Sequence, residues 1–391
     1  PMVFVTKGSF ATSKSGQRLR TILLGVQFII SISLISSSIY MRVQHYYMTN
    51  YDIGFNKENI LSVWMSYDVA GKSGKIYMDK MLLNTQIKDV TAIDGVVVAP
   101  SRMGWGRDIK GINRWFQCFP VAPNFLDFMG IKVVEGRDFT EDDNLKPEGA
   151  YIFNETAKNE FDITLEDQIN GHNNITNIVG FCEDFNFKPL QYPLSPLALY
   201  VFGSEPWRPL SHIYIRTTKN ADIKSVIDYM QSTMVELDPK ITKDEVKVMF
   251  FDEELGENYY KEDRLSTLIT TFSVISIIIS LMGVFGLVMF ETQYRRKEIG
   301  LRRVHGASQR EILKMFNRKY IIIVLVCFVI AAPVTYYILS VWVSQFAYHA
   351  PISWWIFALA LLLVLFITIT TVTVRSYKSA NEDPVSSIKT E

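Results

Sequence analysis

Four apolar stretches constrain the fold of this 391-residue chain more than any other feature. They cover residues 21–43, 263–291, 320–344 and 353–374. About 20 apolar residues, at a helical rise of about 1.5 Å each, are needed to cross the hydrocarbon core of a bilayer. Because each stretch is that long, we predict a multi-pass membrane protein with four transmembrane α-helices.

A large α+β domain is predicted between the first two of these helices. Residues 44–262 have ordinary globular composition, contain no long apolar run, and are numerous enough to bury a core of their own. Strand-like and helical patterns are mixed along them, which indicates two lobes. The predicted strands are residues 61–65, 93–99, 115–121, 175–182, 197–202, 212–217 and 246–251. The predicted helices are residues 75–87, 154–161 and 221–237, the second of them capped by Asn154.

Charge is distributed unevenly along the chain. Residues 44–262 carry 22 Lys and Arg against 33 Asp and Glu, a net charge of −11, and the other residues carry +11. Basic residues beside membrane spans stay in the cytoplasm. We therefore predict residues 1–20, 292–319 and 375–391 inside, with the domain and the 345–352 loop outside. An acidic domain also argues against nucleic-acid binding.

One stretch, ETQYRRKEIGLRRVHGASQREILKMFNRK (residues 291–319), is strongly basic and is called the basic segment below. Gly306 can adopt the left-handed conformation that ends a helix. Ser308 and Glu311 have the spacing of a capping box, which starts a new helix at the next residue. We predict a helix, a break at His305 and Gly306, and a second helix. From charge alone, a solvated loop that only sets topology is equally compatible with this stretch.

The motif RRKEIGLRRVHGAS (residues 295–308) closely resembles the signature after the second spanning helix of FtsX-like, MacB-like ABC transporter permeases. Three parts of the domain, residues 121–143, 150–161 and 178–200, resemble the core of MacB-like periplasmic domains. The resemblance extends from about residue 18 to the C-terminus, which is nearly the whole chain.

This resemblance implies a permease subunit of an ABC-type exporter in a bacterial inner membrane, with its large domain in the periplasm. It implies a separate cytoplasmic ABC ATPase subunit that binds ATP and Mg²⁺, so that this chain itself holds no cofactor or metal and is not an enzyme. Further implied partners are a second permease copy or half in a dimeric assembly, the lipid bilayer and a periplasmic adaptor. The substrate would be a macrolide, a peptide or a lipoprotein, and the sequence would be the C-terminal half of a longer chain.

The same resemblance assigns ATPase coupling to the basic segment. The residues assigned to it are Arg296, Glu298, Ile299, Gly300, Arg302, Arg303, Gly306, Ala307, Ser308 and Ile312. Glu298 and Arg302 are also spaced to pair at i, i+4 on one helix.

Two fragments of the domain superficially resemble ATPase motifs. Residues 66–73, SYDVAGKS, nearly fit a phosphate-binding loop, but Ser66 stands at the first glycine position. Glycines there allow backbone N–H groups to surround phosphate. Residues 246–253 resemble a magnesium-binding strand, yet the chain has no LSGGQ signature, and both fragments lie on the predicted outer side. Nucleotide binding by this chain is therefore disfavoured.

No catalytic or metal site is indicated. The five histidines are scattered without ligand spacing. We interpret the acidic pairs Asp142–Asp143 and Glu253–Glu254 as solvated surface. Two cysteines of the domain could pair if they lay close together, but the favoured interpretation is two unpaired small apolar residues. They are Cys118 and Cys182.

Three further expectations concern the membrane helices. Residues 252–290 are predicted to form one long helix, capped by Asp252, so that a stalk continues into the second span. Small residues at 273, 276, 280 and 283 should allow close helix packing in lipid. Pro333 is expected to kink the third span.

Two other classes of function remain open at this level. One is a membrane sensor or scaffold whose outer domain binds a ligand, which would be supported by a fused signalling domain. The other is a membrane-anchored outer enzyme, which would need a convergent catalytic cluster. Neither feature is found in the sequence.

Overall fold

The computed structural model describes residues 14–99, 104–170, 175–204 and 206–380. The chain divides into two compact units. The membrane unit contains the chain up to Met48, Lys261–Gln345 and the chain from His349 onward. The domain unit contains Thr49–Tyr260 and, from the far end of the sequence, Phe346–Tyr348.

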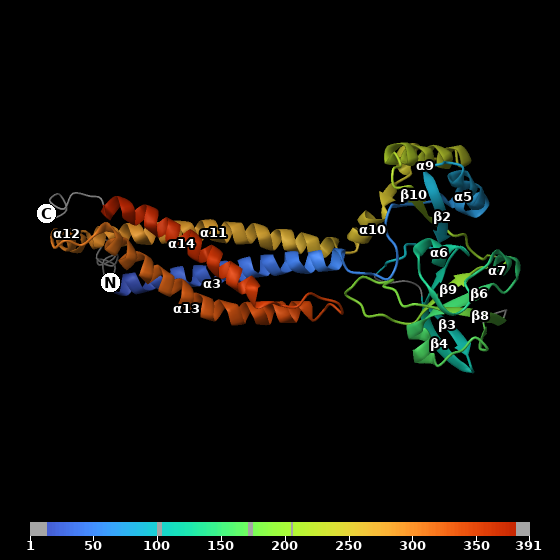
Figure 1. Cartoon of the computed structure of the whole chain (residues 1–391), viewed down its shortest axis with the longest axis horizontal. Helices are drawn as coiled ribbons and strands as arrows, with labels where there is room; N and C mark the ends of the chain where they lie inside the picture. Colours follow the sequence, from blue (N-terminus) through green and yellow to red (C-terminus); the bar gives the residue numbers. More distant parts are fainter. Residues whose placement is uncertain (1–13, 100–103, 171–174, 205, 381–391) are drawn as a thin grey trace, which may run out of the picture. The chain divides into compact units, whose positions relative to one another are not determined.

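Four helices of the membrane unit are long and apolar enough to cross a membrane, as predicted. They are α3 (Lys14–Thr49), α11 (Tyr260–Tyr294), α13 (Gln309–Val343) and α14 (Trp354–Ala380). The short helix α12 (Arg296–Val304) follows the C-terminal end of α11 (Figure 1). Helix α13 continues as one helix through Pro333. Side chains from all four long helices share one apolar core, which includes Phe28, Val288, Tyr320, Val324 and Ala360.

A polar seam joins α3 to α11 inside this unit. The hydroxyl oxygen of Ser31 lies 2.7 Å from that of Ser276 and 2.8 Å from that of Ser280. One turn further on, a Cβ added to Gly283 would lie 2.6 Å from the Gln27 side-chain oxygen. The predicted small-residue face of the second span therefore packs against the first span, and the hydroxyls of Ser276 and Ser280 are satisfied by the partner helix rather than by lipid.

The first lobe of the domain unit is a four-stranded antiparallel sheet. In spatial order its strands are β11 (Val248–Phe250), β1 (Ile60–Trp64), β10 (His212–Thr217) and β2 (Ile87–Ile93). Helices α5 (Gly74–Leu82) and α9 (Ile223–Leu237) lie together beside this sheet (Figure 1). Their apolar faces, including Tyr77, Met81 and Met230, share a core with the inner face of the strands.

The second lobe is a closed ring of six strands. In order around the ring they are β3 (Gly104–Ile109), β4 (Ile112–Pro120), β9 (Leu197–Val201), β6 (Ala150–Asn154), β8 (Ile175–Cys182) and β7 (Gln168–Asn170). Strand β7 closes the ring because it pairs with both β8 and β3. Strand β5 (Val133–Gly136) pairs with the remaining part of the β8 edge. Closure leaves few unpaired strand edges in this lobe.

Short helices complete the domain unit. They are α4 (Tyr67–Lys72), α6 (Phe125–Met129), α7 (Glu141–Leu145), α8 (Glu155–Phe161), α10 (Phe251–Glu257) and a 3₁₀ turn at Lys243–Glu245. A single core that includes Ile93, Phe119, Phe125, Leu199 and Tyr214 lies between the two sheets and unites the lobes. The α+β architecture with two lobes is confirmed.

Several local predictions are confirmed and two are wrong. Asn154 caps α8 by accepting a hydrogen bond from the N–H of Ala157 at 3.0 Å, and the strands at 175–182 and 212–217 have the predicted bounds. The helix expected to reach residue 87 ends at Leu82, and the strand expected at 93–99 occupies Ile87–Ile93 instead. Asn84 causes the difference, because its side chain accepts the N–H of Gln86 and turns the chain into β2.

The predicted continuous helix at 252–290 is also wrong. Helix α10 ends at Glu257 and α11 begins at Tyr260. The two residues between them are held by the domain: the Asn258 amide donates to the carbonyl of Val98 at 3.1 Å, and the Tyr259 oxygen accepts the N–H of Leu190 at 3.1 Å. Asp252 lies in the first turn of α10 rather than at its cap, which is Phe250.

Candidate functional site

The basic segment folds as two helices separated by a sharp, well-bonded break. The C-terminal end of helix α12 is closed by a hydrogen bond in which the N–H of Ala307 donates to the carbonyl of Arg302 at 3.0 Å. The intervening Gly306 has a φ of 90°, a left-handed conformation that favours glycine. A hydrogen bond that spans six residues around a left-handed glycine defines the Schellman motif at the C-terminus of a helix. The predicted break is confirmed.

The second helix of the segment starts with a complete capping box. The Ser308 hydroxyl accepts the N–H of Glu311 at 3.3 Å, and the Glu311 carboxylate accepts the N–H of Ser308 at 2.9 Å. These two bonds satisfy backbone donors that no residue inside α13 can reach. The predicted cap is confirmed, so the direction of the chain on both sides of Gly306 is set by hydrogen bonds.

The inner face of the segment is anchored in the membrane unit. Ile299 of α12 and Ile312 of α13 are both buried and join the apolar core shared by the long helices. Gly300 is buried beside Ile299. Three of the predicted site residues are therefore buried in the membrane unit, and the two isoleucines among them fix the segment to the helix bundle.

Polar contacts tie α12 to the neighbouring helices. The Arg302 guanidinium donates to the Glu298 carboxylate at 2.8 Å, as predicted, and also to the Met315 sulfur on α13 at 3.3 Å. At the ends of the segment, Lys319 of α13 forms an ion pair with Glu291 of α11. The segment is thus braced as a rigid unit between α11 and α13.

The outward face of α12 carries two apolar side chains that the sequence analysis did not select. Leu301 is 59% exposed and Val304 is 63% exposed. At 100° per residue they lie on the side of the helix away from Ile299, on the same side as the exposed Lys297. Their i, i+3 spacing opposite the buried isoleucine is the signal that could have revealed them.

The remaining predicted site residues lie on the same structure. Arg296 is partly exposed on the first turn of α12, Arg303 lies on its last turn, and Ala307 is partly exposed within the break. All ten predicted residues are therefore brought into one helix–break–helix element, of which only some face outward.

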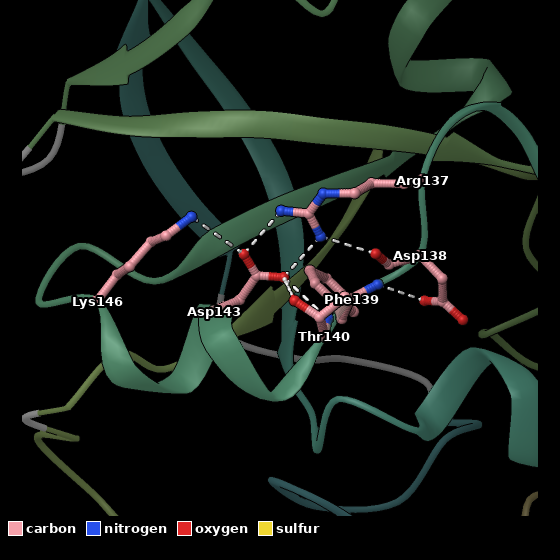
Figure 2. Close-up of polar contacts among 6 residues, drawn as sticks. All are labelled: Arg137, Asp138, Phe139, Thr140, Asp143 and Lys146. Atoms are coloured by element: carbon pink, nitrogen blue, oxygen red, sulfur yellow. Dashed lines mark hydrogen bonds and ion pairs between the residues drawn. The ribbon is translucent and has the colours of Figure 1, made fainter.

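The acidic pair Asp142–Asp143 is not simply solvated surface, which corrects the sequence interpretation. Asp143 is only 1% exposed and accepts two bonds from the Arg137 guanidinium, at 2.7 and 2.8 Å (Figure 2). It also accepts the backbone N–H of Thr140 at 2.9 Å. Burial alone would raise the pKa of this carboxyl, but the bonds from Arg137 and Thr140 outweigh it and hold the pKa at about 2. Asp143 therefore fastens the turn before α7 and is unsuited to acid–base work.

The second acidic pair contains a similar exception. Glu254 of α10 is buried, accepts a bond from the Tyr214 hydroxyl at 3.0 Å, and lies 3.3 Å from the Nε2 atom of His212. Its neighbour Glu253 is exposed, as predicted. These contacts join α10 to β10. Among the residues that the structure describes, no group of three His, Cys, Asp or Glu side chains is arranged to hold a metal ion.

The other sequence candidates have structural roles. Cys118 and Cys182 are both buried, and burial raises the pKa of the Cys182 thiol, so it stays protonated. The stretch at 66–73 is the helix α4, capped by Ser66, and Lys72 on it pairs with Asp68. A capped helix with its lysine paired does not fit a phosphate-binding loop.

Comparison with known proteins establishes the family. Residues 20–233 match the MacB-like periplasmic core domain, and residues 270–384 match the FtsX-like permease C-terminal family. The chain belongs to the MacB-like, FtsX-like family of ABC transporter permeases. The permease is 21% identical over 280 residues to an uncharacterized ABC transporter permease, YknZ of Bacillus subtilis strain 168, and the match covers 69% of each chain.

Two solved structures resemble part of the permease. The periplasmic region of MacB from Actinobacillus actinomycetemcomitans is 12% identical, with a TM-score of 0.40 over 54% of the permease and 96% of that chain. The extracellular domain of the noncanonic ABC-type transporter YknZ from Gram-positive bacteria is 14% identical, with a TM-score of 0.37 over 49% of the permease and all of that chain. The permease is a membrane protein of this family, as the sequence motifs predicted.

Proposed function

We propose that this permease couples ATP hydrolysis by a separate cytoplasmic ABC ATPase to movement of its own extracytoplasmic domain. The observation that carries the proposal is the outward face of α12. Leu301 and Val304 are exposed on the C-terminal half of a basic helix whose opposite face carries the buried Ile299. Apolar side chains surrounded by charged ones are typical of the centre and rim of a protein–protein interface.

The bracing of the segment supports a mechanical role. If the basic segment acts as a lever, it must be stiff, because a loosely attached helix would dissipate displacement before it reached the spans. Here the break is set by Gly306 and Ser308, and the buried side of α12 is fixed by Ile299. The ion pair between Glu291 and Lys319 joins the two long helices that flank the lever. A push on α12 would therefore be passed directly to α11 and α13.

The remaining parts of the proposal follow from the family. ATP and Mg²⁺ would be bound by the ATPase, and the permease would act without chemistry of its own as one half of a dimeric assembly. It would lie in a bacterial inner membrane with its domain in the periplasm, where a periplasmic adaptor is a further possible partner. The substrate would be a macrolide, a peptide or a lipoprotein acted on outside the membrane.

The experiment is purification of the native complex with a Leu301→Asp variant beside the wild type. We expect the wild-type permease to recover a companion chain that has a complete phosphate-binding loop and an LSGGQ signature. A charge at Leu301 should reduce that recovery at least severalfold, because it would be desolvated in the interface. Leu145→Asp is the matched control, since Leu145 is 72% exposed but belongs to the domain unit. Equal recovery with all three proteins would refute the coupling role of α12.

A further inference from the structure

Four neighbouring strands of the ring, β4, β3, β7 and β8, present an exposed outer face. Their inward side chains fill the core of the ring, among them Trp105, Ile109, Phe116, Ile169 and Ile178. Since side chains alternate between the two faces of a strand, the residues beside these point outward. The outward residues are Gly104, Gly106, Asp108, Asn113, Trp115, Gln168, Asn170, Ile175 and Asn177. They are called the outer face below.

Trp115 forms an aromatic platform on the outer face. It pairs with Gly106 of β3, and its indole fills the space that a side chain at Gly104 would occupy, because a Cβ there would lie 2.4 to 2.5 Å from three ring atoms. One side of the ring therefore covers the glycine backbone, yet Trp115 is 68% exposed. Shielding of the two glycines explains the covered side of the indole. The opposite side is left as a surface for stacking.

A row of polar side chains runs across the strands beside this ring. The register aligns Asn113 with Asp108 and Asp108 with Asn170, so the three side chains follow one another from β4 to β7. The Asn170 amide donates to the Asp108 carboxylate at 3.0 Å. Two positions away on β7, the Gln168 amide donates to the Asn177 side chain of β8 at 3.0 Å. Because neighbouring strands lie about 4.8 Å apart, the row extends about 14 Å from β4 to β8.

The amide side chains of this row retain hydrogen-bonding capacity. Asn113, Gln168, Asn170 and Asn177 are all exposed. A side-chain amide has two N–H donors and an oxygen acceptor with two lone pairs, and each bond described above uses only one of these. Sugar hydroxyls both donate and accept, so adjacent hydroxyls match such amides. An aromatic ring packs well against the apolar C–H side of a sugar ring.

The charge of the outer face selects among ligands. Asp108 is the one charged side chain among the outward residues named above, and Asn170 already donates to it. A nucleic acid would need Lys or Arg beside the stacking ring, because phosphate contacts supply much of its binding. We propose that the outer face binds an extended chain of neutral sugars, with one sugar stacked on Trp115 and its neighbours bonded by the amide row. The site lies within the domain unit alone, so the proposal is independent of the coupling function.

The test is binding of neutral oligosaccharides to the full chain in lipid nanodiscs, because maltoside detergents would themselves supply sugars. The probes are cellohexaose and the hexamer of N-acetylglucosamine, and isothermal titration calorimetry measures their affinity. We expect saturable binding of at least one probe. Trp115→Ala should weaken it about tenfold or more, whereas Trp115→Tyr keeps an aromatic ring and should weaken it no more than about threefold. Absence of binding of both probes to the wild type would overturn the proposal.

Trp64→Ala is the matched control, because Trp64 is 53% exposed on β1 in the other lobe and its loss should leave binding unchanged. Asn113→Ala and Asn170→Ala should each weaken binding about threefold with little change in thermal stability. If Trp115→Ala does not fold, undiminished binding by both asparagine variants refutes the proposal.

Two further outcomes would contradict the glycan site. Wild-type affinity in a Trp115→Ala variant of lowered thermal stability would show that the indole serves only to shield the glycines of β3. Tighter binding of dextran sulfate or single-stranded DNA than of either hexamer would assign the outer face to an acidic polymer instead.

Discussion

Glu291 at the end of α11 and Lys319 on α13 are joined by an ion pair across the two ends of the basic segment, and the Tyr320 hydroxyl lies 3.4 Å from the same carboxylate. The side chain of Glu291 is largely buried, whereas that of Lys319 is half-exposed. Removing one partner leaves the other charge poorly solvated. The pair therefore holds the two ends of the lever together more firmly than a surface salt bridge would.

From this contact we predict that Glu291→Gln and Lys319→Met each destabilise the permease, by between about 1 kcal/mol and about 3 kcal/mol. The double variant should recover most of the loss, because it leaves no unpaired charge. Thermal inactivation of the purified protein in detergent measures the effect, with Lys314→Met on the exposed side of α13 as control. Simple addition of the two losses in the double variant would show that the pair is not coupled.

The left-handed conformation of Gly306 predicts that three substitutions at this position destabilise the break to increasing degrees. A Cβ at this position meets no atom within 4 Å, so the cost of a substitution is backbone strain rather than a clash. Gly306→Asn should be mild, Gly306→Ala should cost about 1–2 kcal/mol, and Gly306→Val more, since a β-branched residue tolerates positive φ least. Hydrogen exchange over residues 301–305 and recovery of the ATPase should worsen in that order.

Gly256→Ala is the control for this series, because it also adds a Cβ to open space but at a residue without positive φ. The topology-only interpretation of the basic segment expects all these variants to be silent, as none changes a charge. Full ATPase recovery with Gly306→Val would favour that interpretation.

The charge asymmetry predicts the topology. In intact spheroplasts, a membrane-impermeant thiol reagent should label Asn144→Cys and Asn220→Cys but not Gln309→Cys. The background should be low, because the native Cys118, Cys182 and Cys327 are all buried. Labelling only of the cysteine at 309 would invert the assignment.

The bonds to Asp143 predict that the stability of the domain depends on pH. Its pKa is about 2 when folded and close to 3.8 without those bonds, so the unfolded chain binds the proton more readily. The stabilisation is fully present above about pH 5 and is lost as the pH falls from there towards 2, an amount of about 2 kcal/mol. Hydrogen exchange at residues 137–143 should therefore rise on acidification beyond its intrinsic change.

Asp143→Asn should remove this dependence and speed exchange already at neutral pH. Asp142→Asn should leave both unchanged, because Asp142 is exposed. An identical pH profile for the wild type and Asp143→Asn would rule out Asp143 as the group responsible.

Features that depend on neighbours in the sequence could be predicted well. The capping box needs only Ser308 and Glu311, three positions apart, and the Asn154 cap needs only its own helix start. The break at Gly306 follows from one residue type. Contacts between distant residues could not be predicted. The sequence around Glu254 indicates solvated surface, because its partners His212 and Tyr214 lie about 40 positions away.

The amino-acid sequence by itself determined the four spans, the separate domain, the family and the local shape of the basic segment, because hydropathy, composition and helix capping act within a few residues of each position. Only the tertiary structure decided which faces of α12 are buried, where the helix at 252–290 breaks, and that residues 346–348 belong to the domain. Each of these depends on long-range packing: Ile299 is covered by other helices, Tyr259 is held by Leu190, and Tyr348 bonds to a residue 158 positions away.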